Sequence, residues 1–334
     1  MKYTRRTFAA GATATFASIG VVRSQARAAQ FAYKYASNID VSHPLNVRMV
    51  EMWKAVKDET KGRLEVQNFP NNQLGGDTAM LTQLRSGALQ FFTLDGGILQ
   101  SVVPVAAIQG VGFAFRNSAD AFRAMDGALG DYVRSDIKAK GLWVFDRMWD
   151  NGMRDITSAK GPIRTADDLV NFKIRTPAGK LWVDLFKALG ASPTPLNFNE
   201  VYTALQTHVI DGQENPPAIL QTARLYEVQK YLSITNHMWS AFHLLGNMDA
   251  WNALPPDIQA VVTRNSRTYA LLQRRDVQLL NDTLIDKLHR EGMAVNNADV
   301  STFRSKLGGF YHQYHTEFGD TAWSLLERYS GKLG

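Results

Sequence analysis

The chain contains no cysteine among its 334 residues. This absence excludes a disulfide framework, a thiolate nucleophile and any metal site with cysteine ligands. The sequence also lacks common enzyme signatures: the G-x-S-x-G nucleophile elbow, the H-E-x-x-H zinc motif, the G-x-x-x-x-G-K-[ST] phosphate loop, the G-x-G-x-x-G dinucleotide loop and the EF-hand loop. His312 and His315 have no carboxylate at a ligand spacing, so the sequence predicts neither a metal site nor a cofactor.

Neither disorder nor a polytopic membrane protein is indicated, because 45% hydrophobic and 20% charged residues are ordinary proportions for a globular chain. The chain is longer than the roughly 250 to 300 residues at which a single hydrophobic core stops growing. We therefore expect two domains.

Acidic residues are missing from the first 29 positions, whereas five basic residues occur there: Lys2, Arg5, Arg6, Arg23 and Arg27. The whole chain has a formal net charge of +6, but removing these five from the 37 basic residues leaves 32 against 31 acidic ones. The remaining chain is nearly neutral, so we expect no nucleic-acid binding through surface charge.

The same N-terminal segment has the layout of an export signal. Its basic start precedes a short apolar run, Phe8 to Val22, and an A-x-A cleavage signature, Ala26-Arg27-Ala28. The run is shorter than the ~20 residues that cross a bilayer, which predicts cleavage after Ala28 rather than a retained anchor. Thr4 to Phe8 resembles a twin-arginine signal but lacks a Lys soon after Phe8, so the general secretory route stays open. Either route leads to the periplasm, and no later stretch is long enough to span a membrane.

Beyond the signal, short β-patterned runs alternate with helical ones, which predicts an α/β fold with partly parallel, mixed sheets. Segments with helical spacing of apolar residues include Pro44 to Thr60 and Thr78 to Ser86. The predicted strands are Phe31–Ser37, Leu64–Phe69, Gln90–Leu94, Leu142–Trp149, Phe172–Thr176, Thr194–Phe198 and His208–Asp211.

One segment is too long for a single small lobe. From Ile258 to Leu288 the apolar residues keep a helical period, and no proline or glycine interrupts residues 257–291. At ~1.5 Å per residue, 30 such residues would span ~45 Å. We expect a long helix that braces two lobes.

Two strand ends carry side chains suited to an organic anion. Arg175 lies near the carboxyl end of the predicted strand Phe172–Thr176, beside a helix start, where its planar two-donor fork and the helix dipole favour an anion. The predicted loop Asp211 to Pro217 is rich in hydrogen-bonding side chains that suit a polar ligand. A surface salt bridge and a plain turn are the respective alternatives.

Several motifs closely resemble the extracytoplasmic solute-binding proteins of TRAP transporters (DctP type). The resemblance runs over nearly the whole chain after residue 28. The matching segments are Asn71 to Leu74 with Met80 to Leu84, Asn151-Gly152-Met153-Arg154, Phe172 to Arg175, Leu189 to Pro195, Glu200 to Thr207, Asp211 to Pro216, and Tyr226 to Lys230 followed by Thr235 to His237.

The resemblance implies a two-lobed periplasmic binding protein that closes on a small organic acid in an inter-lobe cleft. Lobe I would comprise residues 29–151 with 241–280, and lobe II residues 152–240 with 281–334. The protein would deliver its ligand to the small and large permease subunits of a sodium-driven transporter and perform no chemistry on it.

The resemblance also implies roles for individual residues. Arg175 matches the arginine that binds the ligand carboxylate in a two-pronged pair, and Arg154 matches a second cleft arginine, with a structural salt bridge as the alternative. Asn215 matches a cleft asparagine at the carboxylate end, and Phe198 an aromatic wall. Further matches, at the ends of the first and third strands, are the polar cleft positions Asn38 and Asp95.

Asp95 bears on the identity of the ligand, because a cleft carboxylate repels a second ligand carboxylate but accepts hydrogen bonds from hydroxyl groups. Trp149 is expected either to stack on a sugar face or to lie in the core. His43 is expected either to contact the ligand or to cap a helix. These residues favour a hydroxylated sugar acid over a C4-dicarboxylate or keto acid. Arg154 is equally suited to bind a second carboxylate of the ligand, so a dicarboxylate stays an alternative. Two further functions stay open as well: an exported sugar-acid lyase using Asp95 or His43 as base, and a ligand-sensing subunit.

Overall fold

The computed structural model describes residues 29–334, within which ten strands form one mixed sheet. The predicted export signal, residues 1–28, lies outside the described residues. The strand order is β2-β1-β3-β9-β5-β8-β6-β7, and β4 and β10 each pair with β9. The strands are β1 (Phe31–Ala36), β2 (Leu64–Phe69), β3 (Phe91–Asp95), β4 (Leu142–Val144), β5 (Trp149–Ser158), β6 (Lys173–Thr176), β7 (Ser192–Pro195), β8 (Gly212–Asn215), β9 (Tyr231–Asn247) and β10 (Ala294–Asn297).

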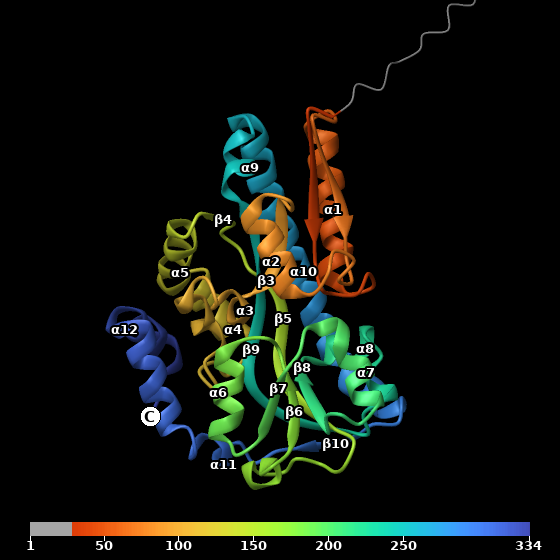
Figure 1. Cartoon of the computed structure of the whole chain (residues 1–334), viewed down its shortest axis with the longest axis vertical. Coiled ribbons are helices and arrows are strands. Elements are labelled where there is room, and N and C mark those ends of the chain that lie inside the picture. Colours follow the sequence, from red (N-terminus) through yellow and green to blue (C-terminus); the bar gives the residue numbers. More distant parts are fainter. Residues whose placement is uncertain (1–28) are drawn as a thin grey trace, which may run out of the picture.

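Two long strands, β5 and β9, join two groups of shorter strands (Figure 1). In the upper group β1 runs parallel to β2 and β3, and in the lower group β6 runs parallel to β7 and β8. One end of β9 pairs with β10 and the other with β3 and β4. We call the parts around β1 to β4 and around β6, β7, β8 and β10 the upper and lower halves. The predicted α/β fold with a mixed sheet is confirmed.

Helices flank both halves of the sheet (Figure 1). In the described residues the α-helices are α1 (Pro44–Glu59), α2 (Asp77–Ser86), α3 (Gly96–Leu99), α4 (Ser118–Met125), α5 (Ala128–Ala139), α6 (Lys180–Ala188), α7 (Val201–Gln206), α8 (Pro217–Thr222), α9 (Met248–Ala253), α10 (Pro256–Arg290), α11 (Val300–Arg304) and α12 (Gly308–Ser330). The 3₁₀ turns are η1 (Pro104–Gly110), η2 (Ala166–Leu169), η3 (Phe198–Glu200) and η4 (Leu225–Glu227).

The long helix α10 has 35 residues and contacts both halves of the molecule. Its rise of ~1.5 Å per residue carries it ~50 Å, from α1 in the upper half to α8 in the lower half. An ion pair between Arg48 of α1 and Asp276, with an Nε–Oδ2 distance of 2.6 Å, ties the two helices together. The predicted bracing helix is therefore confirmed.

Some strand predictions are wrong for local reasons. The run Leu142–Trp149 is two strands, β4 and the start of β5, and Phe198 begins η3 instead of ending β7. The predicted strand His208–Asp211 is a turn, because His208 has a left-handed φ of 56°, and the strand is the following segment, β8. The predicted polar loop at Asp211 to Pro217 is thus largely a buried strand.

The prediction also missed β9, the longest strand of the described chain. All of its residues after Asn236 are buried, so both faces of this part of the strand are covered. A strand buried on both faces lacks the alternation of apolar and polar residues by which strands are recognised. Among residues 29–334, none of the helices has the length and apolar character that a membrane crossing requires.

Candidate functional site

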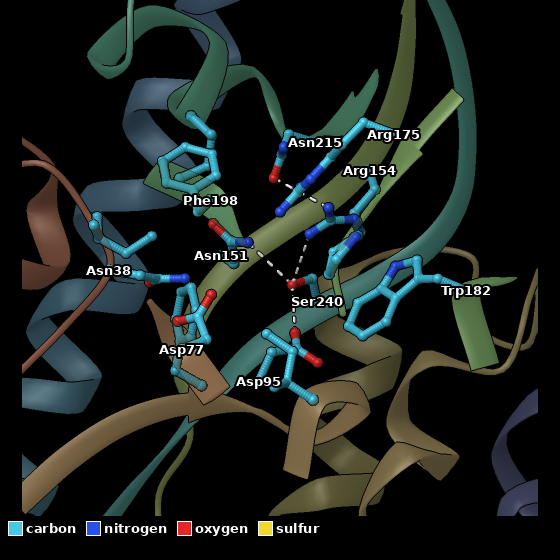
Figure 2. A pocket seen from close by; sticks show the side chains of 15 residues that line it. Asn38, Asp77, Asp95, Asn151, Arg154, Arg175, Trp182, Phe198, Asn215 and Ser240 are labelled. Atoms are coloured by element: carbon cyan, nitrogen blue, oxygen red, sulfur yellow. Dashed lines mark hydrogen bonds between the residues drawn. The ribbon is translucent and has the colours of Figure 1, made fainter. Parts of the chain in front are cut away.

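A pocket lies between the two halves, and side chains from both line it (Figure 2). We call Arg154, Arg175 and Asn215, from β5, β6 and β8, the basic wall. We call Asn38, Asp77 and Asp95, which follow β1, begin α2 and end β3, the acidic wall. Figure 2 shows these walls on opposite sides of the space. The other lining residues are Ile39, Ile98, Asn151, Pro177, Trp182, Phe198, Ile219, Ser240 and Phe242.

Arg175 lies one residue before the carboxyl end of β6 and is only 2% exposed. Its Nε and Nη2 atoms both donate to the carbonyl oxygen of Leu196, at 3.1 and 2.7 Å. Among the side chains that the structure describes, no carboxylate forms an ion pair with it, and burial lowers the pKa of the guanidinium to about 10 although Glu214 partly offsets this. A buried cation without a counterion is costly unless something else supplies the negative charge.

The contact with Leu196 leaves one edge of the Arg175 guanidinium available. The carbonyl occupies the Nε edge, which leaves the Nη1–Nη2 edge of this lining residue without an acceptor on that edge from the described chain. Two parallel N–H donors on this edge match the two oxygens of a carboxylate. The site is therefore pre-shaped for a bidentate anion.

Arg154, in contrast, has a protein acceptor at each of its three guanidinium nitrogens. Its Nε contacts the Glu214 carboxylate, and its Nη2 donates to Glu214 Oε1 at 2.7 Å and to Asn215 Oδ1 at 3.1 Å. Its Nη1 donates to Ser240 Oγ at 3.2 Å. The structural salt bridge that was the alternative for Arg154 thus exists, and the residue also lines the pocket.

Glu214 keeps a negative charge beside Arg154 although it is fully buried. Burial alone would raise the pKa of this carboxyl, but the Arg154 guanidinium and His237, whose Nε2 lies 3.1 Å from Oε2, hold the pKa below its usual value. The negative charge of Glu214 thus balances the positive charge of Arg154. Arg175 is consequently the one lining cation whose charge the described chain leaves unbalanced at short range.

Asn215 completes the basic wall and is held at both amide atoms. Its Oδ1 accepts from Arg154, and its Nδ2 donates to Gln213 Oε1 at 2.5 Å. Gln213 in turn donates to Thr157 Oγ1 at 2.9 Å. Such a satisfied, buried network is rigid, so the basic wall is organised before any ligand arrives.

Asp95 is tied down in a similar way on the acidic wall. It caps α3 by accepting from the backbone N–H of Gly97 at 2.8 Å, and it accepts from Ser240 Oγ at 2.6 Å. Burial raises the pKa of Asp95, while these two donors work in the opposite direction. Ser240, from the shared strand β9, thereby connects Arg154 to Asp95 across the pocket (Figure 2).

Asp77 and Asn38 are far less satisfied. Asp77 is 1% exposed, and its Oδ1 has no hydrogen-bond partner among the described residues. The same holds for Oδ1 of Asn38. Burial raises the pKa of Asp77 to about 6, while Asn38 and Arg175 oppose the shift. The acidic wall therefore presents acceptor oxygens that lack donors.

Two aromatic rings flank the arginines. The guanidinium carbon of Arg175 lies 5.8 Å from the centre of the Phe198 ring, and that of Arg154 lies 5.5 Å from the Trp182 ring. Trp182 also touches the upper half at Gly97, where a Cβ atom would come within 2.0 Å of the ring. Beside this contact, the backbone N–H of Leu181 donates to Gln100 Oε1 at 3.0 Å. The two halves thus meet closely next to the pocket.

Two residues of the sequence prediction do not line the pocket. Trp149 is fully buried and belongs to the same core cluster as Phe91 and Trp53. His43 caps α1: its Nδ1 accepts from the backbone N–H of Leu45 at 3.1 Å, and burial lowers the pKa of the ring to about 4. A core tryptophan and a capping histidine, the second roles considered for these positions, describe them correctly.

Five polar or aromatic lining residues were not predicted: Asp77, Asn151, Trp182, Ser240 and Phe242. Asn151 lies in a β-bulge between Asp150 and Gly152. A regular strand sends residues three positions apart to opposite faces, yet Asn151 and Arg154 both line the pocket, since a bulge re-aims side chains. Ser240 belongs to the strand that sequence patterns missed. Asp77 could have been identified from the sequence, because it begins a helix directly after Gly75-Gly76.

The described part of the chain holds no group of three or more His, Asp or Glu side chains arranged to bind a metal ion. The lining chemistry is that of guanidinium, carboxylate, amide and hydroxyl groups around aromatic rings. This combination can bind and orient a polar organic anion.

Residues 35–317 match the family model described as bacterial extracellular solute-binding protein, family 7. The chain is 34% identical over 254 residues to the 2,3-diketo-L-gulonate-binding periplasmic protein YiaO of Escherichia coli, covering 76% of this chain and 77% of that protein.

Solved structures are similar over nearly the whole described chain. A TRAP periplasmic solute-binding protein from Polaromonas, bound to D-erythronate, superimposes with a TM-score of 0.86 at 29% identity and covers 91% of this chain and 99% of that one. The sugar acid binding protein of Advenella mimigardefordensis, in complex with galactonate, gives a TM-score of 0.87 at 25% identity, covering 92% and 100%.

Proposed function

The chain belongs to the bacterial extracellular solute-binding protein family 7, and from this membership we propose that it is the solute-binding component of a TRAP transporter that captures a hydroxylated sugar acid, such as a uronate or an aldonate. It is exported to the periplasm by its N-terminal signal, holds the acid between its two halves, and passes it unchanged to the small and large membrane permease subunits.

The observation that carries this proposal is the state of Arg175. Its guanidinium is buried, lacks a carboxylate partner in the described chain, and lines the pocket with a two-donor edge that the Leu196 carbonyl does not occupy. A ligand carboxylate supplies both the missing charge and the missing acceptors. Asn215 lies beside the bound carboxylate, and Phe198 packs against the ligand.

The balance of charge favours a sugar acid over a C4-dicarboxylate. Arg154 is already paired with Glu214, so it offers no free charge for a second ligand carboxylate. Asn38 and Asp95 of the acidic wall instead meet hydroxyl groups. The relatives named above bind 2,3-diketo-L-gulonate, D-erythronate and galactonate, each of which has one carboxylate and several hydroxyls.

Capture works by closure of two lobes. Lobe I comprises residues 29–151 with 241–280, and lobe II residues 152–240 with 281–334, so that β5, β9 and α10 cross between them. The ligand contacts the basic wall of lobe II and the acidic wall of lobe I together. Its binding therefore shifts the protein from an open to a closed form.

A thermal-shift screen of the purified mature chain tests the ligand class. Aldonates, uronates, C4-dicarboxylates, keto acids and aromatic acids are compared at equal concentration. A ligand that binds only the folded protein raises the melting temperature by mass action. We expect the largest rises with hydroxylated monocarboxylates. Rises confined to dicarboxylates, or to keto acids without hydroxyls, would overturn the sugar-acid assignment.

The proposal also requires that the ligand is not transformed. Incubation of stoichiometric protein and sugar acid, followed by mass spectrometry of the released small molecule, should return the acid unchanged. Appearance of a dehydrated product would instead support an exported lyase. The geometry disfavours a lyase, because His43 is buried away from the pocket and Asp95 is held by Ser240 and Gly97.

A further inference from the structure

Asp77 is a buried carboxylate with one oxygen that the described chain leaves without a hydrogen bond. The N-cap of α2 is Gly76, and no side chain caps that helix, so Asp77 does not do for α2 what Asp95 does for α3. It lies in the pocket lining at 1% exposure, and its Oδ1 lacks a partner among the described residues. Burying an unsatisfied carboxylate costs stability, so this oxygen is better explained by a partner that comes with the ligand.

The position of Asp77 relative to the arginines defines what that partner is. Asp77 and Asn38 lie together on the acidic wall, across the pocket from Arg175 (Figure 2). A ligand whose carboxylate binds Arg175 therefore presents its other end to Asp77. A hydroxyl at that end donates to the free Oδ1, whereas a second carboxylate faces a negative charge in a site from which water is largely excluded.

The net charge around the pocket reinforces this interpretation. Two guanidinium groups, of Arg154 and Arg175, are set against three carboxylates, of Asp77, Asp95 and Glu214. One ligand carboxylate is matched by Arg175, and no further cation of the lining remains for another. Burial raises the pKa of Asp77 to about 6, so its carboxyl is still mostly ionised at pH 7.5.

We propose that Asp77 determines specificity at the end of the ligand opposite the carboxylate, accepting a hydrogen bond from a hydroxyl group there and rejecting a second carboxylate. This inference rests on the proposed function, since it takes Arg175 as the carboxylate site. It assigns the selection against dicarboxylates to one side chain. Specificity of this kind is built by repulsion of the wrong ligand as much as by attraction of the right one.

Matched pairs of acids test the proposal by isothermal titration of the mature chain. D-erythronate is paired with meso-tartrate and D-galactonate with galactarate, because the members of each pair differ only in a terminal CH₂OH or carboxylate. We expect the wild type to prefer the aldonate by about 100-fold or more in the pair that fits the pocket, equivalent to ~2.7 kcal/mol. Asp77→Asn should shrink that preference at least tenfold, chiefly by tightening the diacid.

Two controls accompany this variant. Asp286→Asn removes an exposed carboxylate of α10 and should leave the preference unchanged. Asp77→Ser provides a second substitution if the amide impairs folding. A preference that changes less than about threefold in both Asp77 variants overturns the proposal. If the wild type binds neither these aldonates nor any aldonate or uronate of the thermal-shift screen, the proposed function itself is wrong, which is a different and recognisable outcome.

A measurement on the wild type alone gives an independent check. Diacid binding requires Asp77 to take up a proton, so diacid affinity should rise about tenfold per pH unit between pH 8 and pH 6, while aldonate affinity stays nearly constant. The groups facing Asp77 are Asn38, Arg175, Asp95 and the backbone of Phe198. Arg175 stays protonated over this range. A diacid affinity that does not change with pH contradicts the proposal.

Discussion

The two walls of the pocket differ in how completely the protein satisfies them. In the basic wall the side chains of Arg154 and Asn215 are hydrogen-bonded to other protein groups, and the Arg175 guanidinium is held on one edge by a carbonyl. In the acidic wall, Asn38 and Asp77 keep buried oxygens without partners in the described chain. One wall is thus organised in advance, and the other depends on its ligand for completion.

This difference explains how a two-sided pocket captures a molecule. A rigid basic wall binds the carboxylate with little loss of side-chain freedom, which favours affinity. Closure of the two lobes buries the unpaired oxygens of the acidic wall, so it is favourable only when ligand hydroxyl groups donate hydrogen bonds to them. Closure is thereby coupled to binding of the right ligand. Affinity and selectivity are therefore assigned to opposite halves of the same molecule, and variants of each wall can separate them.

The largest expected effect comes from breaking the pair inside the basic wall. Glu214→Gln leaves Arg154 and His237 buried without their common anion, and removing one partner of a buried ion pair destabilises by about 3 to 5 kcal/mol. Urea denaturation measures the change. Glu51→Gln, which breaks an exposed pair with Arg48, should cost under ~1 kcal/mol. Equal stabilities of the two variants would show that the network does not hold the wall together.

Arg175→Ala should abolish most binding and spare the fold. Its loss leaves the ligand carboxylate desolvated without a charge partner, at a cost of about 2 to 5 kcal/mol in binding free energy. Arg175→Lys should also be impaired, because an ammonium cannot reproduce the two-donor edge. Titration calorimetry with the best ligand of the thermal screen measures both, and Arg275→Ala on the exposed face of α10 is the control. Affinity within threefold of the wild type would remove Arg175 from the site.

Contact between the halves gives the next prediction. Gly97→Ala would place a Cβ atom about 2.0 Å from the Trp182 ring, so α3 and α6 could not meet. An overpacked contact costs about 1 to 3 kcal/mol, which lowers affinity roughly tenfold or more. X-ray scattering should find the variant expanded even with ligand. Gly161→Ala, whose new Cβ meets nothing within 4 Å, should close normally. A compact, ligand-bound Gly97→Ala protein would refute the need for this contact.

Sequence reasoning recovered the parts that depend on local pattern. The strand β6 with Arg175 near its end, the strand β3 ending at Asp95, and the long helix α10 all follow from periodicity and chain breaks. The family resemblance supplied Arg154, Asn215, Phe198 and Asn38, all of which line the pocket. Their binding roles and the lobe boundaries stay predictions.

What sequence could not supply depends on tertiary context. The role of Glu214 could not be predicted, because β8 is a buried strand of polar residues and such a pattern is typical of loops. Its partner Arg154 also lies 60 positions away in the sequence. Ser240 was hidden because β9 is buried on both faces. Trp149 could be either a ligand platform or a core residue by composition, and only the register of β5 with β9 decides for the core.

The smallest effect tests whether the acidic wall opposes closure when it is empty. Burial in the closed form raises the pKa of Asp77 to about 6 from a usual 3.8, so the closed form binds a proton more strongly than an open, solvated one. Closure of the empty protein should therefore become easier as the pH falls, about twofold at pH 6 and about tenfold at pH 5 relative to pH 8.

X-ray scattering of the ligand-free protein across pH 8 to 5 measures this shift as a falling radius of gyration. Asp77→Asn should be more closed at pH 8 and should lose most of the pH response. A smaller response is expected to persist, because burial also raises the pKa of Asp95 and the sign is the same. An unchanged pH response in Asp77→Asn would mean that the unsatisfied carboxylate does not hold the empty pocket open, and the acidic wall would then select ligands without controlling closure.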